Sequence, residues 1–153
     1  MVSSSPHVKA EHTTRKIMLD VVIALMPALI AGIYFFGVYV LFLTVVSVGC
    51  CVGFEWIWEK VFKRTITIGD LSAVVTGVLL AYNVPARAPV YIIVIGAFVS
   101  IILAKQVFGG IGQNFINPAL AARAFLLAGY STDMRSFPVP EQGRLLSSVD
   151  AVT

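Results

Sequence analysis

Two long apolar runs constrain the fold of this chain more than any other feature. They extend from Ile17 to Phe36 and from Val38 to Trp58, separated by Gly37, which is suited to a tight turn. Each run has about the 20 residues that a helix needs to cross a bilayer. Of the 153 residues, 58% are apolar and 12% are charged, whereas soluble domains are about 25% charged. The sequence therefore predicts an all-α integral membrane protein.

Three shorter apolar segments follow, at residues 71–84, 90–108 and 117–130. The first and the last are short for a crossing, so we expect them to be tilted or to begin partway through the bilayer, as the broken helices of transporters do. This gives about five transmembrane or broken helices in a membrane domain at residues 17–130. A cytoplasmic leader at residues 1–16 and a polar outer segment at 131–153 would flank that domain.

Basic residues cluster beside the apolar runs and predict the orientation. Arg15 and Lys16 precede the first run, and Lys60, Lys63 and Arg64 follow the second. Two crossings return the chain to its starting side, so both clusters satisfy the positive-inside rule if they are cytoplasmic. We expect a multi-pass membrane protein with a cytoplasmic N-terminus. The net charge of +3 is small for a nucleic-acid binder, so nucleic acid is not an expected partner.

The sequence offers no motif for catalysis or for a metal site. Cys50 and Cys51 are the two cysteines, adjacent within an apolar run, and they lack the spacing of a zinc or cluster site. We interpret them as packing residues. There is also no nucleophile and base pair, no phosphate-binding loop and no HExxH motif, which argues against a hydrolase.

A polar stretch, GGIGQNFINPALAARAF, interrupts the apolar sequence from Gly109 onward. Glycines including Gly112 end the preceding helix, and Asn117 followed by Pro118 is typical of a helix start. Irregular backbone at membrane depth persists only where protein buries it or a cavity hydrates it. The amides of Gln113, Asn114 and Asn117, beside a helix N-terminus, would suit a planar heterocycle with amide-like edges.

Arg123 lies about two turns into the helix that follows. An arginine within a membrane segment is by default a candidate for a functional site. The alternative is a re-entrant turn in which the amides satisfy broken backbone and Arg123 pairs with Asp20, Glu55 or Asp70; the spacing favours neither interpretation. Asp20 and Glu55 could also belong to an ion path, although a solvated or paired carboxylate is favoured for each. Lys105 is expected to extend to the membrane surface.

Four blocks of the sequence together resemble a known family. They are SPH at residues 5–7, IMLDVVIALMPALIAGIYFFG at 17–37, GDLSAVVTGVLLA at 69–81 and KQVFGGIGQNFINPALAARAFL at 105–126. In this order they look like RnfD, a membrane protein of the Rnf complex, which is an ion-translocating ferredoxin:NAD oxidoreductase. The sister protein is the one designated B in the sodium-pumping NADH:quinone oxidoreductase.

The resemblance implies an architecture and two cofactors. Family members are about twice as long as this chain and contain two inverted five-helix halves, similar to urea transporters, so the chain looks like the first half. They carry a non-covalent riboflavin, which the resemblance places beside Asn114 and Asn117, with Gly112, Gln113 and Arg123 as further candidates. They also carry FMN esterified to a threonine. Asp150 and Thr153 match the start of that motif, whose acceptor would lie three residues beyond Thr153, so we expect no covalent FMN on this chain.

The function that the resemblance implies is electron transfer across a bacterial or archaeal cytoplasmic membrane, coupled to movement of Na⁺ or H⁺. The expected partners are the other Rnf membrane and redox subunits and membrane lipid. Two alternatives from other classes remain: a channel or transporter for a small solute, which would be colourless, and a scaffold without either activity.

Overall fold

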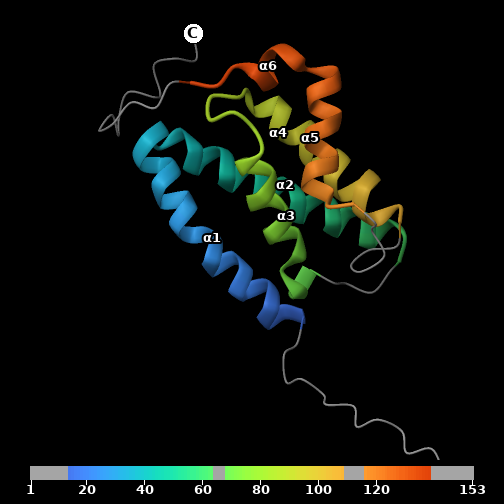
Figure 1. The fold of residues 1–153 in the computed structure, drawn as a ribbon. Helices are drawn as coiled ribbons and strands as arrows, with labels where there is room; N and C mark the ends of the chain where they lie inside the picture. Colours follow the sequence, from blue (N-terminus) through green and yellow to red (C-terminus); the bar gives the residue numbers. More distant parts are fainter. Residues whose placement is uncertain (1–13, 64–67, 109–115, 139–153) are drawn as a thin grey trace, which may run out of the picture.

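The computed structural model describes residues 14–63, 68–108 and 116–138, and all regular structure within these ranges is helical (Figure 1). The all-α class is therefore confirmed for the part of the chain that is described. The elements, in chain order, are α1 (Thr14–Phe36), α2 (Tyr39–Val61), the 3₁₀ turn η1 (Ile68–Asp70), α3 (Ser72–Tyr82), α4 (Val90–Phe98), the π-helix η2 (Val99–Gln106), α5 (Pro118–Gly129) and α6 (Ser131–Arg135).

α1 and α2 form a hairpin of two long apolar helices. Each has 23 residues, and both are long and apolar enough to cross a bilayer. The turn between them depends on Gly37, whose φ of 89° is in the left-handed region that glycine adopts without strain. α1 begins at Thr14, so Arg15 and Lys16, the last residues of the expected leader, are already helical.

α3 is short and lies against α2. It has 11 residues, which span about 16 Å at 1.5 Å per residue, roughly half of the hydrocarbon core. Gly77 allows the close approach, because a Cβ atom there would lie 2.7 Å from the Cα atom of Val48. Ser47 fixes the crossing by donating to the Gly77 carbonyl oxygen (2.7 Å).

α4 continues without a break into η2, so residues 90–106 form one helix that changes its winding at Val99. α5 packs on η2, α4 and α3. The core lies where these elements meet and includes the fully buried side chains Leu80, Ile92, Ile93, Ile101 and Leu126.

The outer segment expected from residue 131 contains a helix that the sequence did not predict. α6 covers Ser131–Arg135, Met134 is buried, and the Tyr91 hydroxyl donates to Asp133 Oδ2 (2.6 Å). These contacts attach residues 131–135 to the start of α4. The described part of this segment is therefore folded against the helices.

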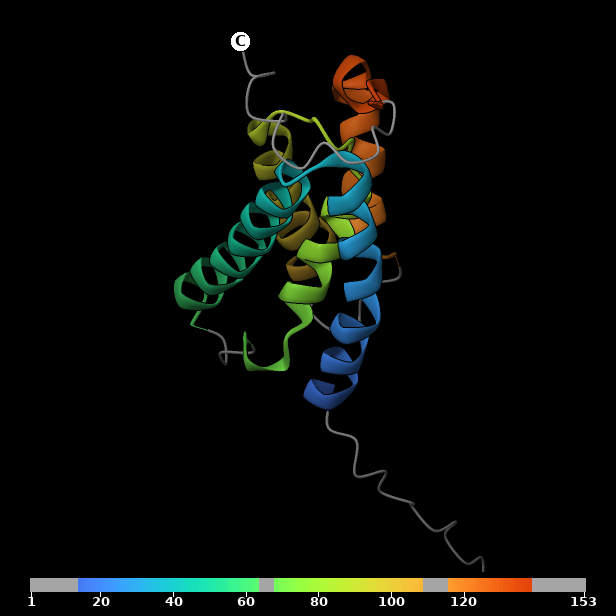
Figure 2. The ribbon, with the colours of Figure 1, turned by 90° about the vertical axis from the view of Figure 1, so that its left-hand side faces the viewer.

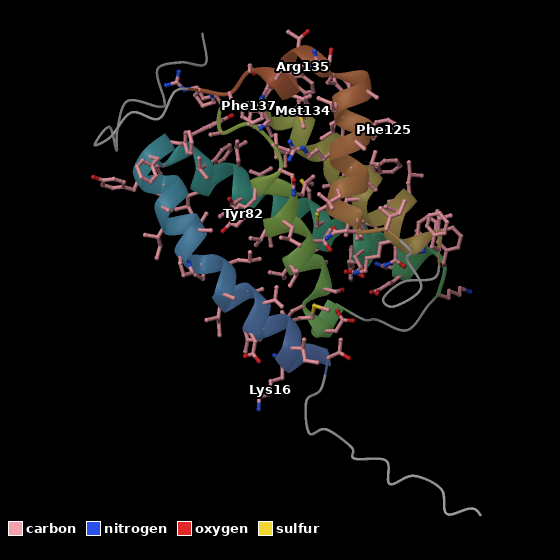
Figure 3. The ribbon with its side chains drawn as sticks, in the orientation of Figure 1. Lys16, Tyr82, Phe125, Met134, Arg135 and Phe137 are labelled. Carbon is pink, nitrogen blue, oxygen red and sulfur yellow. The ribbon has the colours of Figure 1, made fainter. Side chains whose placement is uncertain are left out.

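The basic residues at the ends of α1 and α2 lie away from α6. In both ribbon views the first turn of α1 and the last turn of α2 lie on the side away from α6, although the two helices diverge toward that side (Figures 1 and 2); Lys60 belongs to that last turn of α2. We call this the basic end. Lys16 lies there, whereas Met134, Arg135 and Phe137 lie at the opposite end, which we call the α6 end (Figure 3).

α1 is the most peripheral helix. It contacts α2, α3 and η1, yet none of its residues is buried. Tyr82 is one tie to the rest of the molecule, since its hydroxyl donates to the Leu25 carbonyl oxygen (2.8 Å; Figure 3). Because the exposed side chains of α1 are largely apolar, this helix faces a non-aqueous medium or another helical surface.

Candidate functional site

The N-terminus of α5 has the geometry predicted for it. Asn117 is the N-cap, with its side-chain Oδ1 accepting from the Ala119 amide (3.0 Å), and Pro118 occupies the first helical position. The cap uses the carboxamide oxygen and leaves the NH₂ group as a donor for another partner. Asn117 is exposed, so a ligand or another helix can reach it.

Three of the predicted site residues, Gly112, Gln113 and Asn114, lie outside the described residues. The structure therefore describes Asn117 and Arg123 from that set. They lie six residues apart on α5, which separates their Cα atoms by about 9 Å along the axis. They do not converge on one atom, and a ligand that contacted both would have to be elongated.

Arg123 links α5 to the end of α3. Its Nη1 donates to Asn83 Oδ1 (3.0 Å), and Asn83 in turn donates to the Leu79 carbonyl oxygen (2.8 Å). Asn83 is the C-cap of α3, where the helix dipole favours a positive charge. In the alternative interpretation Arg123 pairs with Asp20, Glu55 or Asp70; the structure instead places the neutral amide of Asn83 beside it.

A second polar site, which we call the Glu55 cluster, lies buried between α2, α3 and η2. It consists of Glu55, Ser72, Lys105 and Gln106, all of them buried. Lys105 Nζ donates to Glu55 Oε1 (2.5 Å) and to Ser72 Oγ (2.6 Å), and Gln106 Nε2 donates to the same carboxylate oxygen (3.0 Å). The Lys105 ammonium on η2 thus joins α2 and α3, through Glu55 and Ser72.

The π-helical winding of η2 brings two consecutive side chains to one acceptor. Lys105 and Gln106 are neighbours in sequence, and both reach Glu55. A π-helix has a wider turn than an α-helix, and such segments are frequent at functional sites. The ladder continues to Val107, whose amide bonds to the Ile102 carbonyl, five residues back.

The sequence interpretation was wrong about Lys105. It was expected to extend to the membrane surface, but it is 2% exposed and forms a buried ion pair. The favoured interpretation of Glu55 as a paired carboxylate is confirmed, with Lys105 as its partner. One sequence signal pointed to the pair: each charge lies near the expected inner end of its span. Asp20, by contrast, is exposed on α1.

Asp70 stabilises the start of α3. Its Oδ1 accepts from the Ser72 amide (3.1 Å), and Leu71 between them has a positive φ of 65°. This arrangement satisfies one of the free amides at the helix start. It also places Ser72, the first residue of α3, within reach of Lys105.

An apolar cavity of about 320 Å³ lies elsewhere, toward the α6 end. Its lining includes Gly32, Phe36, Tyr82, Val84 and Phe137, with no charged side chain among the residues that line it. It does not include Asn117, Arg123 or any member of the Glu55 cluster. This cavity is therefore separate from the polar chemistry.

Two helices long and apolar enough to cross a membrane, shorter helices packed on them and a buried ion pair between them define the class: a helical protein of the membrane type. The chain belongs to the NQR2, RnfD, RnfE family, whose model matches residues 1–153. The resemblance found in the sequence is thereby confirmed at the level of the family.

Individual relatives support this assignment, and each is the subunit designated D in its complex. The chain is 54% identical over 135 residues to that of the Na⁺-translocating ferredoxin:NAD⁺ oxidoreductase complex of Acetobacterium woodii, covering 88% of this chain and 42% of that protein. It is 40% identical over 152 residues to that of the proton-translocating ferredoxin:NAD⁺ oxidoreductase complex of Clostridium ljungdahlii, covering 99% and 45%. It is 39% identical over 136 residues to that of the ion-translocating oxidoreductase complex of Haemophilus ducreyi, covering 88% and 39%. The chain thus spans less than half the length of these relatives.

Proposed function

We propose that this chain is part of a membrane subunit of an Rnf-type complex, which passes electrons across the membrane and couples them to ion movement. The identity of 54% to the Acetobacterium woodii protein, over 88% of the chain, is the observation that carries this proposal. The helices agree with it, since two are long enough to span a bilayer and α3 and α5 are short. Its partners would be the other subunits of the complex and membrane lipid.

The proposed cofactor is a non-covalent riboflavin at the start of α5. Asn117 supports this placement, because it is exposed at a helix N-terminus and its NH₂ group is not needed for the cap. Helix N-termini favour electron-rich or anionic groups, and carboxamides pair with the polar edge of a flavin ring. Bound flavin would supply the electron-carrying chemistry, while Asn117 orients it. FMN would be attached to a threonine beyond Thr153 in a longer chain.

Arg123 has a supporting part in this proposal. Its guanidinium has five N–H donors, and one nitrogen donates to Asn83. The remaining donors could contact an oxygen-rich part of the ligand from the side of α3. We therefore keep Gly112, Gln113, Asn114, Asn117 and Arg123 as the proposed riboflavin residues.

A visible absorption spectrum of the purified intact complex tests the function directly. A flavin spectrum that is bleached by reduction, with riboflavin released on denaturation, is the expected result. A colourless complex that conducts a small solute would instead support the transporter alternative. If neither colour nor flux were found in an intact complex, the scaffold alternative would stand.

The proposed orientation has the basic end in the cytoplasm, because Lys16 lies in the first turn of α1 and Lys60 in the last turn of α2. Cysteines introduced at Lys60 and Ser131, in a background with Cys50 and Cys51 replaced by alanine, report the two ends. We expect an impermeant thiol reagent to label the Ser131 position in intact cells and the Lys60 position only after lysis. The reverse pattern would show that the orientation is inverted.

A further inference from the structure

The Glu55 cluster contains an acceptor atom that the described residues do not satisfy. Glu55 is fully buried, and its Oε1 accepts from both Lys105 and Gln106, whereas Oε2 has no hydrogen-bond partner in the described part of the chain. Buried polar atoms in proteins nearly always have a partner, because an unpaired one loses its hydration without compensation. Oε2 therefore points to a further species that binds at this position.

A second atom of the same kind lies on η2. The Ser100 hydroxyl is fully buried and lacks a partner among the described residues. Ser100 precedes Lys105 by five residues, which is the hydrogen-bonding interval of a π-helix, so the two lie one turn apart on a similar face. Each of these two atoms provides a hydrogen-bonding position for ordered water.

The positive charge of Lys105 determines which species can bind at Glu55 Oε2. The Lys105 ammonium neutralises the charge of the Glu55 carboxylate and also donates to the Ser72 hydroxyl oxygen. A metal cation would need several oxygen ligands and would be repelled by the ammonium at short range. A proton needs only one oxygen atom. The cluster is therefore suited to a proton and unsuited to Na⁺.

We propose that Glu55, held by Lys105, is a proton-binding site within the membrane domain. A proton from water forms an O–H bond at Glu55 Oε2 and returns to water on release, so no bond within the protein is broken. The cluster changes from neutral to a charge of +1. Its use in coupling rests on the proposed function, because this added charge would compensate one electron on a flavin held at α5, which packs directly on η2.

The neighbouring ionisable groups act on this site in opposite directions. Glu59 on α2 and Asp70 on η1 disfavour a negative charge on Glu55, whereas Lys105 on η2 favours it. The Cys51 thiol lies close enough to interact electrostatically with both Glu55 and Lys105. α3 contributes the neutral Ser72 hydroxyl. Burial and the two neighbouring carboxylates favour the protonated form of Glu55, and Lys105 favours the ionised form.

Infrared difference spectroscopy of the intact complex at varied pH, with the redox state held fixed, tests the proposal. We expect a protonated-carboxyl C=O band to grow on acidification, to be lost in Glu55→Gln and to shift in frequency in Glu55→Asp. Asp20→Asn removes an exposed carboxyl on α1 and should leave the band unchanged. Exchange of K⁺ for Na⁺ should also leave it unchanged.

Lys105→Met provides a second readout. Without the ammonium, Glu55 can avoid a buried unpaired charge only by holding its proton, so the band should persist to higher pH. A band that survives in Glu55→Gln, or that Na⁺ removes in competition with the proton, would overturn the proposal. Flavin absorbance, recorded on the same samples, separates this result from the proposed function, since the pH-dependent band does not require flavin.

Discussion

Lys105 and Arg123 are two cations on helices that pack against each other, but they differ in burial and in the charge of their partners. Lys105, on η2, is buried and paired with a carboxylate, whereas Arg123, on α5, is exposed and bonded to the neutral Asn83 side chain. A buried charge needs a full set of partners within the protein. An exposed arginine at membrane depth retains donors that a ligand, a lipid or another helix can use.

The contrast extends to the surroundings of each cation. The Glu55 cluster ties α2, α3 and η2 together through three hydrogen bonds to or from its charged groups. The polar groups of α5 each make one contact, the Asn117 cap and the Arg123 link to Asn83. Stability should therefore depend mainly on the cluster, and ligand binding mainly on α5.

The largest expected effect is on the cluster. Lys105→Met leaves a buried carboxylate without its counter-charge, so we expect a loss of about 3–5 kcal/mol in the free energy of unfolding at alkaline pH, where Glu55 is ionised. The loss should shrink on acidification, because a neutral carboxyl needs no counter-charge. Thermal unfolding of the detergent-solubilised complex, followed across pH, measures it.

Two further variants serve as controls for this prediction. Adding Glu55→Gln to Lys105→Met should recover most of the lost stability, since neither charge then remains. Arg123→Gln, which removes an exposed cation, should lower the unfolding temperature far less than Lys105→Met. Equal losses in Arg123→Gln and Lys105→Met would show that the two cations do not differ in the way their burial indicates.

An intermediate effect is expected at the crossing of α2 and α3, which sets the position of Ser72 in the cluster. Gly77→Ala would place a Cβ atom 2.7 Å from the Val48 Cα atom. The backbones must separate, at about 1–3 kcal/mol. Gly49→Ala, at a glycine of α2 where a Cβ atom would meet nothing within 4 Å, should be tolerated. The comparison of the two unfolding temperatures decides whether close packing holds α3 in place.

The smallest effect on stability is expected at Asn117, together with a loss of ligand. Asn117→Leu removes the cap, at about 1 kcal/mol, and the amide donor proposed for riboflavin. Asn117→Ser retains a capping oxygen and removes the NH₂ group, so stability should be preserved while riboflavin content falls. Full riboflavin content in Asn117→Ser, measured by fluorescence after denaturation, would limit this residue to capping.

Much of the fold could be predicted from local features. The adjoining ends of α1 and α2 follow from Gly37, whereas each helix extends three residues beyond the predicted apolar run at its other end. The start of α5 follows from Asn117 and Pro118, since a cap acts within its own turn. α6 was missed, because five residues with a single buried side chain, Met134, carry no periodic apolar pattern.

Which segments are helical and apolar could be read from the chain alone, because helix length, turns and caps depend on residues near one another in sequence. The partners of the charges came from the packing of the helices. Lys105 and Glu55 are 50 residues apart, and their pairing depends on how closely Gly77 lets α3 approach α2 and on the π-helical winding of η2. The contact between Arg123 and Asn83 likewise depends on the packing of α5 against α3. Long-range packing of this kind sets which polar groups lie together, and no local sequence pattern predicts it.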